Sequence, residues 1–307
     1  MSSEPRRLVI LVGPTAAGKS RAAARLALAR NGEVVNCDSQ QVYRGFDIGT
    51  DKPSAETRAA VPHHLIDVAD PRVQFTAADF AAGAMEAIRE IHGRGRLPIV
   101  AGGSGLYVRA LTDGLFPGPG RDAELRRALE AEAAAKGYPA LFEELRRVDP
   151  AYAAKIHERD RVRIIRALEV YRATGRTLSE HFLATASPLA GLAVAKLGLT
   201  LARPELHRRI DARVDAMFAR GLVEEVRGLL ASGLPPTAPP FRGLGYRQVL
   251  AHLAGDLTFA EAVSAAKLET RQFAKRQMTW FRKMEGFIWL AADDLAELEI
   301  RLAAALQ

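Results

Sequence analysis

The first hundred residues alternate between short apolar runs and longer amphipathic stretches. Four apolar runs predict buried strands, of which the last is the weakest: Arg7–Val12, Glu33–Cys37, Leu97–Ala101 and His64–Val68. Two stretches have helical spacing, Lys19–Arg30 and Thr76–His92. Strands that alternate with helices form parallel sheets covered on both faces, so this part of the chain predicts an α/β core.

A different pattern begins at the chain breaker Pro117-Gly118-Pro119-Gly120. From Arg121 to about Leu183 the spacing is helical, with turns at Gly137, Asp149-Pro150 and Gly175. Beyond it we expect a strand, two long helices and a last strand, at Ala193–Leu201, Pro204–Ser232, Thr258–Lys283 and Phe287–Leu290. The predicted organisation is a core domain of residues 1–116 and 191–307, interrupted by an all-helical insertion domain of residues 117–190.

A phosphate-binding loop lies between the first strand and the first helix. The segment Gly13-Pro14-Thr15-Ala16-Ala17-Gly18-Lys19-Ser20 matches the pattern G-x-x-x-x-G-K-[ST] in full. The N–H groups of such a loop wrap a phosphate, and the positive end of the following helix adds to the attraction. Lys19 supplies a charge for the terminal phosphate, and Ser20 supplies an oxygen for Mg²⁺. The flanking strand and helix argue against a chance match, so we expect a P-loop NTPase-like sheet.

The acidic residue that usually accompanies this loop is missing from its usual place. Most proteins with the loop also hold their metal with an Asp at the end of another apolar strand. Here Leu97–Ala101 is followed by Gly102-Gly103-Ser104, which weakens the case for an enzyme that hydrolyses ATP or GTP. Asp38 directly follows the second strand, and the carboxyl ends of parallel strands line the ligand crevice. It is therefore the candidate general base or metal ligand, with a helix cap as the alternative.

Positive charge is concentrated in two segments of the 307-residue chain, whose formal net charge is +7. Lys155–Arg176 has seven Lys or Arg residues against three Asp or Glu, and Lys267–Lys283 has six against one. The remainder of the chain is therefore slightly acidic. Such concentration predicts contact with a phosphate backbone, and the alternative is two solvated helix faces.

The composition excludes several classes of protein. The single cysteine, Cys37, rules out a disulfide framework and a cysteine-rich zinc site, and it suits a cytoplasmic protein. No apolar run is long enough for a membrane helix, and Met1–Arg7 lacks the apolar core of a signal peptide. Nothing in the pattern indicates a symmetric interface, so we expect a monomer.

Motifs longer and rarer than the phosphate loop resemble those of the bacterial tRNA dimethylallyltransferases, also called tRNA isopentenyltransferases. Together with the loop they span about residues 8 to 290: Asp38-Ser39-Gln40, Tyr43-Arg44-Gly45, Asp47-Ile48-Gly49-Thr50, Lys52-Pro53, Pro62-His63-His64-Leu65-Ile66-Asp67, Gly102-Gly103-Ser104-Gly105-Leu106-Tyr107, Arg166-Ala167-Leu168-Glu169-Val170, Gly243-Leu244-Gly245-Tyr246-Arg247-Gln248, Arg271-Gln272, and Ala274-Lys275-Arg276-Gln277 with Trp280. The resemblance implies transfer of a dimethylallyl group from its diphosphate to N6 of adenosine 37, beside the anticodon of tRNAs that read codons starting with U.

The resemblance also implies roles for individual residues. Dimethylallyl diphosphate takes the place of ATP in the loop Gly13–Ser20, with Mg²⁺ at Ser20. Asp38 accepts the N6 proton, and Lys19, Ser104 and Arg213 complete the catalytic set, although many relatives have Thr in place of Ser104. Contacts with the anticodon stem-loop of tRNA are implied for Asp38, Ser39, Gln40, Gln41, Ser104, Val162, Arg163, Ile164, Ile165, Arg166, Arg242, Gly243, Leu244, Gly245, Tyr246 and Arg247.

Several alternatives stay open on the sequence alone. Tyr246 and Trp280 have arginine neighbours, as in sites that stack on displaced bases, but either ring also suits a core. Arg209 and Arg213 share a helix face and either bind diphosphate or pair with acids at the surface. For His63 and His64 we expect a structural role.

Two other functions compete with prenyl transfer. The first is a kinase of the same fold, which would turn over ATP. The second is a non-catalytic RNA-binding protein, against which the intact Lys19, Ser20 and Asp38 argue.

Overall fold

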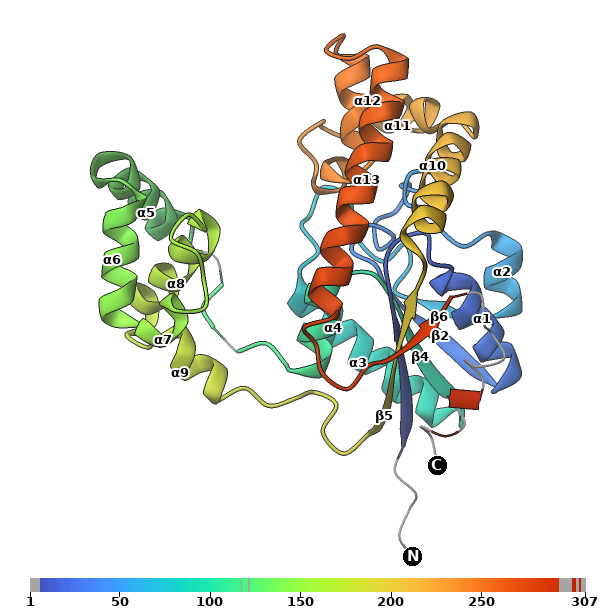
Figure 1. Ribbon diagram of the computed structural model, residues 1–307, viewed down its shortest axis with the longest axis horizontal. Coiled ribbons are helices and arrows are strands. Elements are labelled where there is room, and N and C mark those ends of the chain that lie inside the picture. The colour runs from blue at the N-terminus through green and yellow to red at the C-terminus, as the bar shows by residue number, and fades with distance from the viewer. Residues whose placement is uncertain (1–5, 117, 121, 293–299, 302–303, 305–307) are drawn as a thin grey trace, which may run out of the picture. The chain divides into compact units, whose positions relative to one another are not determined.

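Six parallel strands form the central sheet of the protein (Figure 1). The computed structural model describes residues 6–116, 118–120, 122–292, 300–301 and 304. In the order β3-β2-β4-β1-β5-β6, the strands are β3 His63–His64, β2 Gly32–Cys37, β4 Leu97–Gly102, β1 Arg7–Val12, β5 Ala193–Thr200 and β6 Ile288–Ala291. Because all neighbouring pairs are parallel, the carboxyl ends of β2, β4, β1 and β5 meet at one edge of the sheet.

Helices cover both faces of the sheet, which confirms the predicted α/β class. They are α1 Lys19–Ala29, α2 Ala55–Ala60, α3 Ala77–Gly93, α4 Gly105–Thr112, α5 Ala123–Lys136, α6 Tyr138–Val148, α7 Pro150–Ala153, α8 Arg161–Thr174, α9 Leu178–Leu183, α10 Arg203–Ala219, α11 Leu222–Ala231, α12 Tyr246–Leu253 and α13 Phe259–Phe281, with a 3-10 helix at Pro239–Arg242. On one face Leu26 of α1 belongs to a core with Val9 of β1, and on the other Ile88 of α3 belongs to a core with Ile10. Successive side chains of a strand point to opposite faces, so β1 supplies both cores.

The chain divides into two compact units. The first contains residues Met1–Thr112 and Leu189–Gln307, and the second contains Asp113–Pro188. The sequence placed the start of the insertion at 117, four residues after the observed start, and its end at 190, two residues beyond the observed end. Residues 117 and 121, where the sequence put the start of the insertion and of its helices, lie outside the described residues.

A layer of helices stands over the carboxyl ends of the strands in the first unit. Figure 1 shows α10, α11, α12 and α13 gathered there, above the sheet. Ion pairs join α10 to α13, between Asp215 and Lys267 and between Asp211 and Arg271. The buried residues of this layer form a third core that also includes Tyr43 and Phe46 from the segment after β2. The layer therefore closes over the edge where the phosphate loop and the end of β2 lie.

Several predicted elements differ from the observed ones. The strand expected at His64–Val68 has only two residues, because Leu65 and Asp67 take a left-handed conformation with φ near 60°. The single helix expected at Pro204–Ser232 is two helices, since Gly221 at φ 96° begins α11. Helices α2, α4 and α12 were not expected from the sequence.

The second unit is a bundle of helices with its own core. Its buried side chains include Leu129, Leu145, Ile164 and Leu168, from α5, α6 and α8. The fully buried Glu169 accepts a hydrogen bond from the backbone N–H of Asp122 at 2.9 Å and forms an ion pair with Arg166 at 3.0 Å. The Arg-Ala-Leu-Glu-Val motif is therefore a structural element of this bundle.

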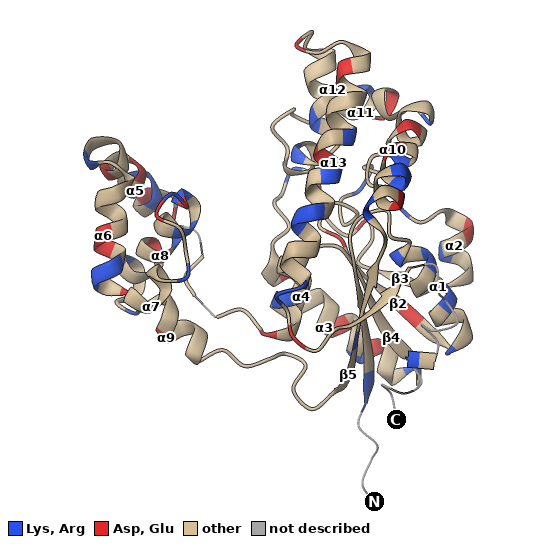
Figure 2. Cartoon of the chain, in the orientation of Figure 1, with Lys and Arg blue, Asp and Glu red and all other residues tan. Residues whose placement is uncertain are grey.

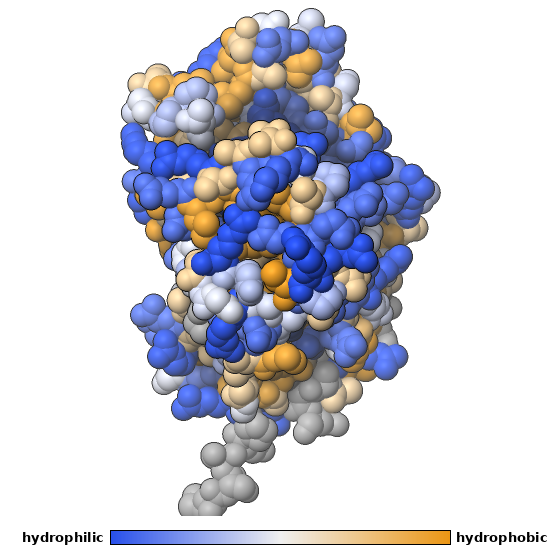
Figure 3. Space-filling model, turned by 90° about the vertical axis from the view of Figure 1, so that its left-hand side faces the viewer, coloured by the Kyte–Doolittle hydropathy of each residue, from blue (hydrophilic) through white to orange (hydrophobic). Residues whose placement is uncertain are grey.

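Basic side chains are prominent on several helices (Figure 2), including α8, α10 and α13. The face in Figure 3 is mostly hydrophilic, with small hydrophobic patches between the polar residues. Within the described ranges, the helices are all too short or too polar to span a membrane.

Candidate active site

The phosphate loop connects β1 to α1 in a conformation that needs its glycines. Gly18 has φ 82° and precedes the first helical residue, and Gly13 approaches Leu199 of β5 so closely that an added Cβ would lie 2.7 Å from its carbonyl oxygen. The Lys19 ammonium donates a hydrogen bond to the carbonyl of Pro14 at 2.8 Å and so folds back over the loop. These contacts give the loop the form of a phosphate cradle at a helix N-terminus.

The ammonium group of Lys19 has a lower pKa than lysine usually has. Its burial, with the nearby Arg213 guanidinium as a second cause, lowers the pKa of Lys19 from 10.5 to about 8, although Asp38 and Cys37 act in the opposite direction. The charges of Lys19, Arg213 and Asp38 therefore act on one another in a single site. A bound diphosphate would neutralise the repulsion between the two cations.

Asp38 follows β2, where the sequence placed it, and caps a tight turn. Its Oδ1 accepts hydrogen bonds from the backbone N–H groups of Gln40 at 2.8 Å and of Gln41 at 3.4 Å. Neither bond engages Oδ2. The neighbouring N–H of Ser39 donates to the hydroxyl of Ser104, at the end of β4, at 2.9 Å. The turn that carries Asp38 is thus fixed to the residue that follows the neighbouring strand. Asp38 caps the turn through Oδ1, and Oδ2 has no hydrogen-bond partner in the part of the chain that the structure describes.

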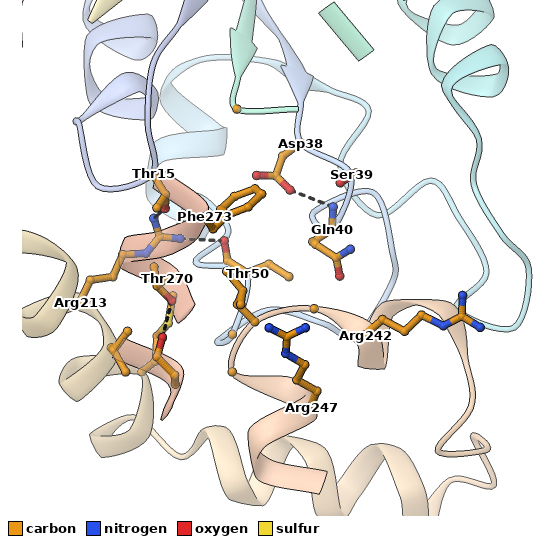
Figure 4. Close-up of a pocket in the computed structure, with 18 of the residues that line it drawn as sticks. Thr15, Asp38, Ser39, Gln40, Thr50, Arg213, Arg242, Arg247, Thr270 and Phe273 are labelled. Carbon is orange, nitrogen blue, oxygen red and sulfur yellow. Dashed lines mark hydrogen bonds between the residues drawn. The ribbon is translucent and has the colours of Figure 1, made fainter. Parts of the chain in front are cut away.

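Arg213 reaches from α10 to the phosphate loop, as Figure 4 shows. Its Nη1 donates to the hydroxyl of Thr15 at 2.8 Å and its Nη2 to the carbonyl of Thr50 at 3.3 Å, while Nε lies 3.3 Å from the Asp51 carboxylate. Arg209, one helical turn earlier, donates to Glu205 instead. Arg209 therefore pairs with an acidic residue of its own helix, whereas Arg213 contacts the phosphate loop. Of these two arginines, Arg213 lines the cavity of this site.

One cavity of about 270 Å³ joins Thr15, Asp38 and Arg213 within the first unit, and Thr15 is the residue of the phosphate loop that lines it. Its polar part is lined by Thr15, Asp38, Ser39, Gln40, Gly103, Ser104 and Arg213 (Figure 4). Its apolar part is lined by Val214, Met217, Phe218, Leu222 and Ala266, which belong to the core of the helical layer. The cavity thus presents a cation and a carboxylate next to an apolar chamber.

Gln277 of α13 is a site residue whose role could not be read from the sequence. Its Oε1 accepts a hydrogen bond from the backbone N–H of Thr15, and its Nε2 donates to the carbonyl of Gly103, both at 2.8 Å. The side chain therefore ties the phosphate loop to the end of β4 inside the cavity. Gln277 belongs to one of the motifs noted in the sequence. Its contact with Thr15, 262 residues away, becomes visible only in the folded structure.

The predicted tRNA-contacting residues of the first unit fall into two groups. Ser39, Gln40, Ser104 and the segment Arg242–Gly245 line the cavity, as does Arg247, which points toward its centre and pairs with Glu269. Gln41 and Tyr246 are buried instead. Gln41 donates to the carbonyls of Thr50 and Asp51, and Tyr246, 1% exposed, has no free face on which a base could stack.

The remaining predicted tRNA-contacting residues lie in the second unit, at the start of α8. Val162 and Arg163 are exposed, and Arg163 pairs with Asp160 at 3.1 Å. Ile164 and Ile165 are buried in the core of the bundle, so their side chains cannot contact RNA directly. Arg166 is partly buried and donates to the carbonyl of Pro119 at 2.9 Å.

Other predictions concern aromatic and histidine side chains. Trp280 packs against the core between the sheet and α3, and an added Cβ on Gly105 would meet its ring at 2.4 Å, which supports the core alternative. His64 lies 2.6 Å from the Glu33 carboxylate and His63 lies 2.7 Å from the carbonyl of Val61. These contacts support the structural role expected for both histidines.

The protein offers few ligands to a magnesium ion. Among the described residues, no three His, Cys, Asp or Glu side chains cluster as a metal site. Ser20 is exposed in the first turn of α1, where its hydroxyl can supply one oxygen. Mg²⁺ commonly keeps several waters and binds through one or two protein oxygens plus substrate phosphates, so this donor set fits an ion that enters with a diphosphate.

Comparisons with known proteins agree with the motifs. Residues 41–284 match the model of a family described as IPP transferase. The chain is 52% identical over 287 residues to the tRNA dimethylallyltransferase of Geobacter metallireducens, covering 94% of this chain and 93% of that one. The protein of the same name from Anaeromyxobacter dehalogenans is 54% identical over 288 residues, covering 93% and 95% of the two chains.

Two solved structures of transferases from this family are also similar to the chain. The full-length tRNA isopentenylpyrophosphate transferase of Bacillus halodurans has a TM-score of 0.73 and 39% identity, over 98% of this chain and 97% of that one. A eukaryotic dimethylallyltransferase acting on tRNA has a TM-score of 0.80 and 30% identity, over 97% of this chain and 77% of that one. Similarity of this degree along nearly the whole sequence shows that the chain belongs to the tRNA dimethylallyltransferase family.

Proposed function

We propose that this enzyme prenylates N6 of adenosine 37 in tRNAs that read codons starting with U and releases diphosphate. By family it is a prenyltransferase that modifies tRNA through dimethylallyl transfer. The motifs suggest the position of the target base. The observation that best supports the chemistry is the single cavity in which Asp38, Thr15 and Arg213 meet an apolar chamber.

The diphosphate of the donor is proposed to lie in the loop Gly13–Ser20. Lys19 and Arg213 supply cations there, and the contact between Arg213 and the Thr15 hydroxyl supports this placement. We propose that Mg²⁺ bound with the donor is held by the Ser20 hydroxyl and would add positive charge beside the leaving oxygens. These groups stabilise the negative charge that grows on diphosphate as it departs.

The dimethylallyl group is proposed to occupy the apolar part of the cavity. Val214 and Met217 follow Arg213 along α10, and Ala266 lies on the neighbouring α13. A five-carbon chain attached to a diphosphate beside Arg213 would therefore pass directly into an apolar environment. Burial of its methyl and methylene groups stabilises the complex by roughly 0.8 kcal/mol for each buried group.

The acceptor adenine is proposed to enter from the side of Asp38 and Gln40. A base in a stacked anticodon loop must first be displaced, at a cost of a few kcal/mol. The Gln40 Oε1 atom is buried, and no hydrogen-bond partner for it occurs among the described residues, so it is suited to accept a hydrogen bond from a bound base. The exposed Arg247 at the cavity offers a plane on which the displaced base can stack.

The proposed reaction forms a C–N bond, breaks a C–O bond and moves one proton from N6 to Asp38. The N6 lone pair of adenine attacks C1 of the dimethylallyl group, and the bond from C1 to the diphosphate oxygen breaks with its electron pair leaving on diphosphate. Asp38 Oδ2 takes the N6 proton, because delocalisation of the amine lone pair into the ring makes N6 a poor nucleophile unless that proton leaves. Oδ1 meanwhile stays bound to the Gln40 N–H and fixes the carboxylate.

The second unit is proposed to bind the anticodon stem of the tRNA. Arg161 and Arg163 are exposed at the start of α8, where the positive end of the helix adds to their charge. Clustered cations at a helix N-terminus favour phosphate groups of an RNA backbone. We also propose that the enzyme acts as a monomer in the cytoplasm, in keeping with its single buried cysteine, Cys37.

A transfer assay with a matched acceptor tests this function. Labelled dimethylallyl diphosphate is incubated with a tRNA that reads a codon starting with U, and with the same tRNA carrying guanosine at position 37, which has an oxygen in place of the N6 amine. We expect label only in the first RNA, and no loss of label when ATP is added in equal amount. Equal label in both RNAs would contradict the proposed position, and turnover of ATP without label would favour the kinase alternative.

A further inference from the structure

A carboxylate anchors one end of the loop that holds Arg213. Glu225 of α11 accepts hydrogen bonds from three successive backbone N–H groups, those of Ile48 at 2.7 Å, Asp47 at 3.1 Å and Gly49 at 3.4 Å. Few side chains can satisfy three consecutive donors, because a carboxylate is the only side-chain group with two acceptor oxygens and no donor. Glu225 therefore anchors the first part of the segment 47–51, which we call the clamp loop, while Gln41 and Arg220 hold its second part at Thr50 and Asp51.

The hydroxyl of Tyr246 completes the anchor. It donates to Glu225 Oε1 at 2.6 Å and accepts a hydrogen bond from the N–H of Gly49 at 3.1 Å. Burial, together with the adjacent carboxylate, raises the pKa of this hydroxyl well above its usual range, so it stays a donor at all physiological pH values. Gly49 lies against the ring itself, since an added Cβ would come within 2.6 Å of it.

The other end of the clamp loop orients Arg213. The Thr50 carbonyl accepts from Arg213 Nη2, and the Asp51 carboxylate pairs with Arg213 Nε, so two of its three contacts come from this loop. The third contact, with Thr15, aims the guanidinium at the phosphate loop. The last donor to Glu225, the N–H of Gly49, belongs to the residue next to Thr50, whose carbonyl is the first acceptor of Arg213. Because the two sets of contacts lie on adjacent residues, a shift of the Glu225 anchor moves the backbone that orients Arg213.

We propose that Glu225, with the hydroxyl of Tyr246, is a positioning residue that sets the aim of Arg213 at the diphosphate through the clamp loop. The proposal rests on the proposed diphosphate-binding role of Arg213. Neither Glu225 nor Tyr246 touches the substrate in this arrangement, because Glu225 lies behind the loop and the Tyr246 ring is buried. The proposed binding of diphosphate is thus supported by a residue that does not line the cavity.

The test is a kinetic double-mutant cycle with Glu225→Gln and Arg213→Ala. Glutamine has an NH₂ group in place of one carboxylate oxygen, and this group cannot accept a hydrogen bond. At least one of the hydrogen bonds that Glu225 accepts must therefore be lost. We expect Glu225→Gln to raise the KM for dimethylallyl diphosphate about tenfold or more with the KM for tRNA unchanged, since misplacement of a binding group by about 1 Å can cost up to 100-fold. In the Arg213→Ala background the same change should add less than about twofold.

Two further variants keep the test decisive. Glu224→Gln on the same helix is the matched control, because Glu224 is exposed and, among the described residues, forms its ion pair with Arg227 one helical turn away. It should leave both KM values unchanged. Tyr246→Phe keeps the packed ring and removes only the hydroxyl, so it should reproduce part of the rise in donor KM even if Glu225→Gln folds poorly.

The outcomes separate the inference from the function on which it rests. If Arg213→Ala alone leaves the donor KM unchanged, Arg213 does not bind diphosphate and the proposed role of that residue fails. If Arg213→Ala raises the donor KM but Glu225→Gln adds the same factor in both backgrounds, the positioning role is refuted. Equal changes in the KM values for donor and tRNA, with a matching loss of melting temperature, would make Glu225 a general structural residue and also overturn the inference.

Discussion

Asp38→Asn is the substitution that most directly probes the proposed general base. Asparagine has nearly the same shape, and its Oδ1 can still accept the Gln40 N–H bond that Asp38 accepts at 2.8 Å. The turn after β2 is therefore expected to keep its conformation. Only the second oxygen changes, from an acceptor that can take a proton to an NH₂ group that cannot.

The expected loss of rate follows from the removal of the general base. Removal of a general base usually costs 10²–10⁴-fold in the chemical step, which corresponds to about 3–5 kcal/mol. A second effect is electrostatic, because Asp38 raises the pKa of Lys19, which is already lowered to about 8. Loss of that charge lowers the Lys19 pKa further, so the comparison belongs at pH 7, where the lysine stays protonated in the wild type.

The assay is a single turnover at saturating donor and tRNA, with enzyme in excess. We expect at least a 100-fold slower transfer for Asp38→Asn, with donor affinity within about threefold of the wild type. Asp70→Asn is the matched control, since the Asp70 carboxylate caps a comparable turn in an exposed loop through the Arg72 N–H at 2.8 Å. A rate within threefold of the wild type for Asp38→Asn would refute the assignment of Asp38 as the base.

Three further predictions concern binding and stability. The KM for dimethylallyl diphosphate should rise about fivefold between pH 8 and pH 9, because Lys19 loses its charge above a pKa of about 8, and this rise should be absent in Lys19→Met. Gln277→Leu should lower kcat/KM for the donor about tenfold, since it leaves the Thr15 N–H and the Gly103 carbonyl without their partner, as steady-state kinetics can check. Burial raises the pKa of the Glu33 carboxyl, but hydrogen bonds from its arginine and histidine partners outweigh this and lower it to about 2. Its contribution to stability is therefore present above pH 4.5 and lost as the pH falls from 4.5 toward 2, and Glu33→Gln should reduce the free energy of unfolding at pH 7 by about 3 kcal/mol in a urea titration.

The local parts of the fold could be predicted from the sequence because local chemistry determines them. The strand Arg7–Val12 is apolar at every position after the first, and its predicted bounds are those observed. The helix at Thr76 begins with a capping box between Thr76 and Asp79, a signal contained in four residues. The strand predicted at His64–Val68 failed because two residues adopt a left-handed conformation that composition does not reveal.

The parts that depend on distant contacts could not be predicted from pattern alone. Gln277 meets Thr15 across 262 residues, and Glu225 meets Ile48 across 177. Tyr246 illustrates the same limit, because an aromatic residue beside an arginine suits both a stacking site and a core. Its burial and its hydrogen bond to Glu225 favour the core in this protein.

The most direct test of the proposed site measures both products in one reaction. Wild-type enzyme, dimethylallyl diphosphate and tRNA are incubated, the released diphosphate is quantified, and the tRNA is digested to nucleosides for mass spectrometry. We predict one diphosphate released for each N6-dimethylallyladenosine formed, with the modified nucleoside mapped to position 37 and both products slowed together in Asp38→Asn. Diphosphate released without a prenylated adenosine, or a prenylated adenosine that forms at the wild-type rate in Asp38→Asn, would contradict a site in which the phosphate loop holds the leaving group and Asp38 takes the proton.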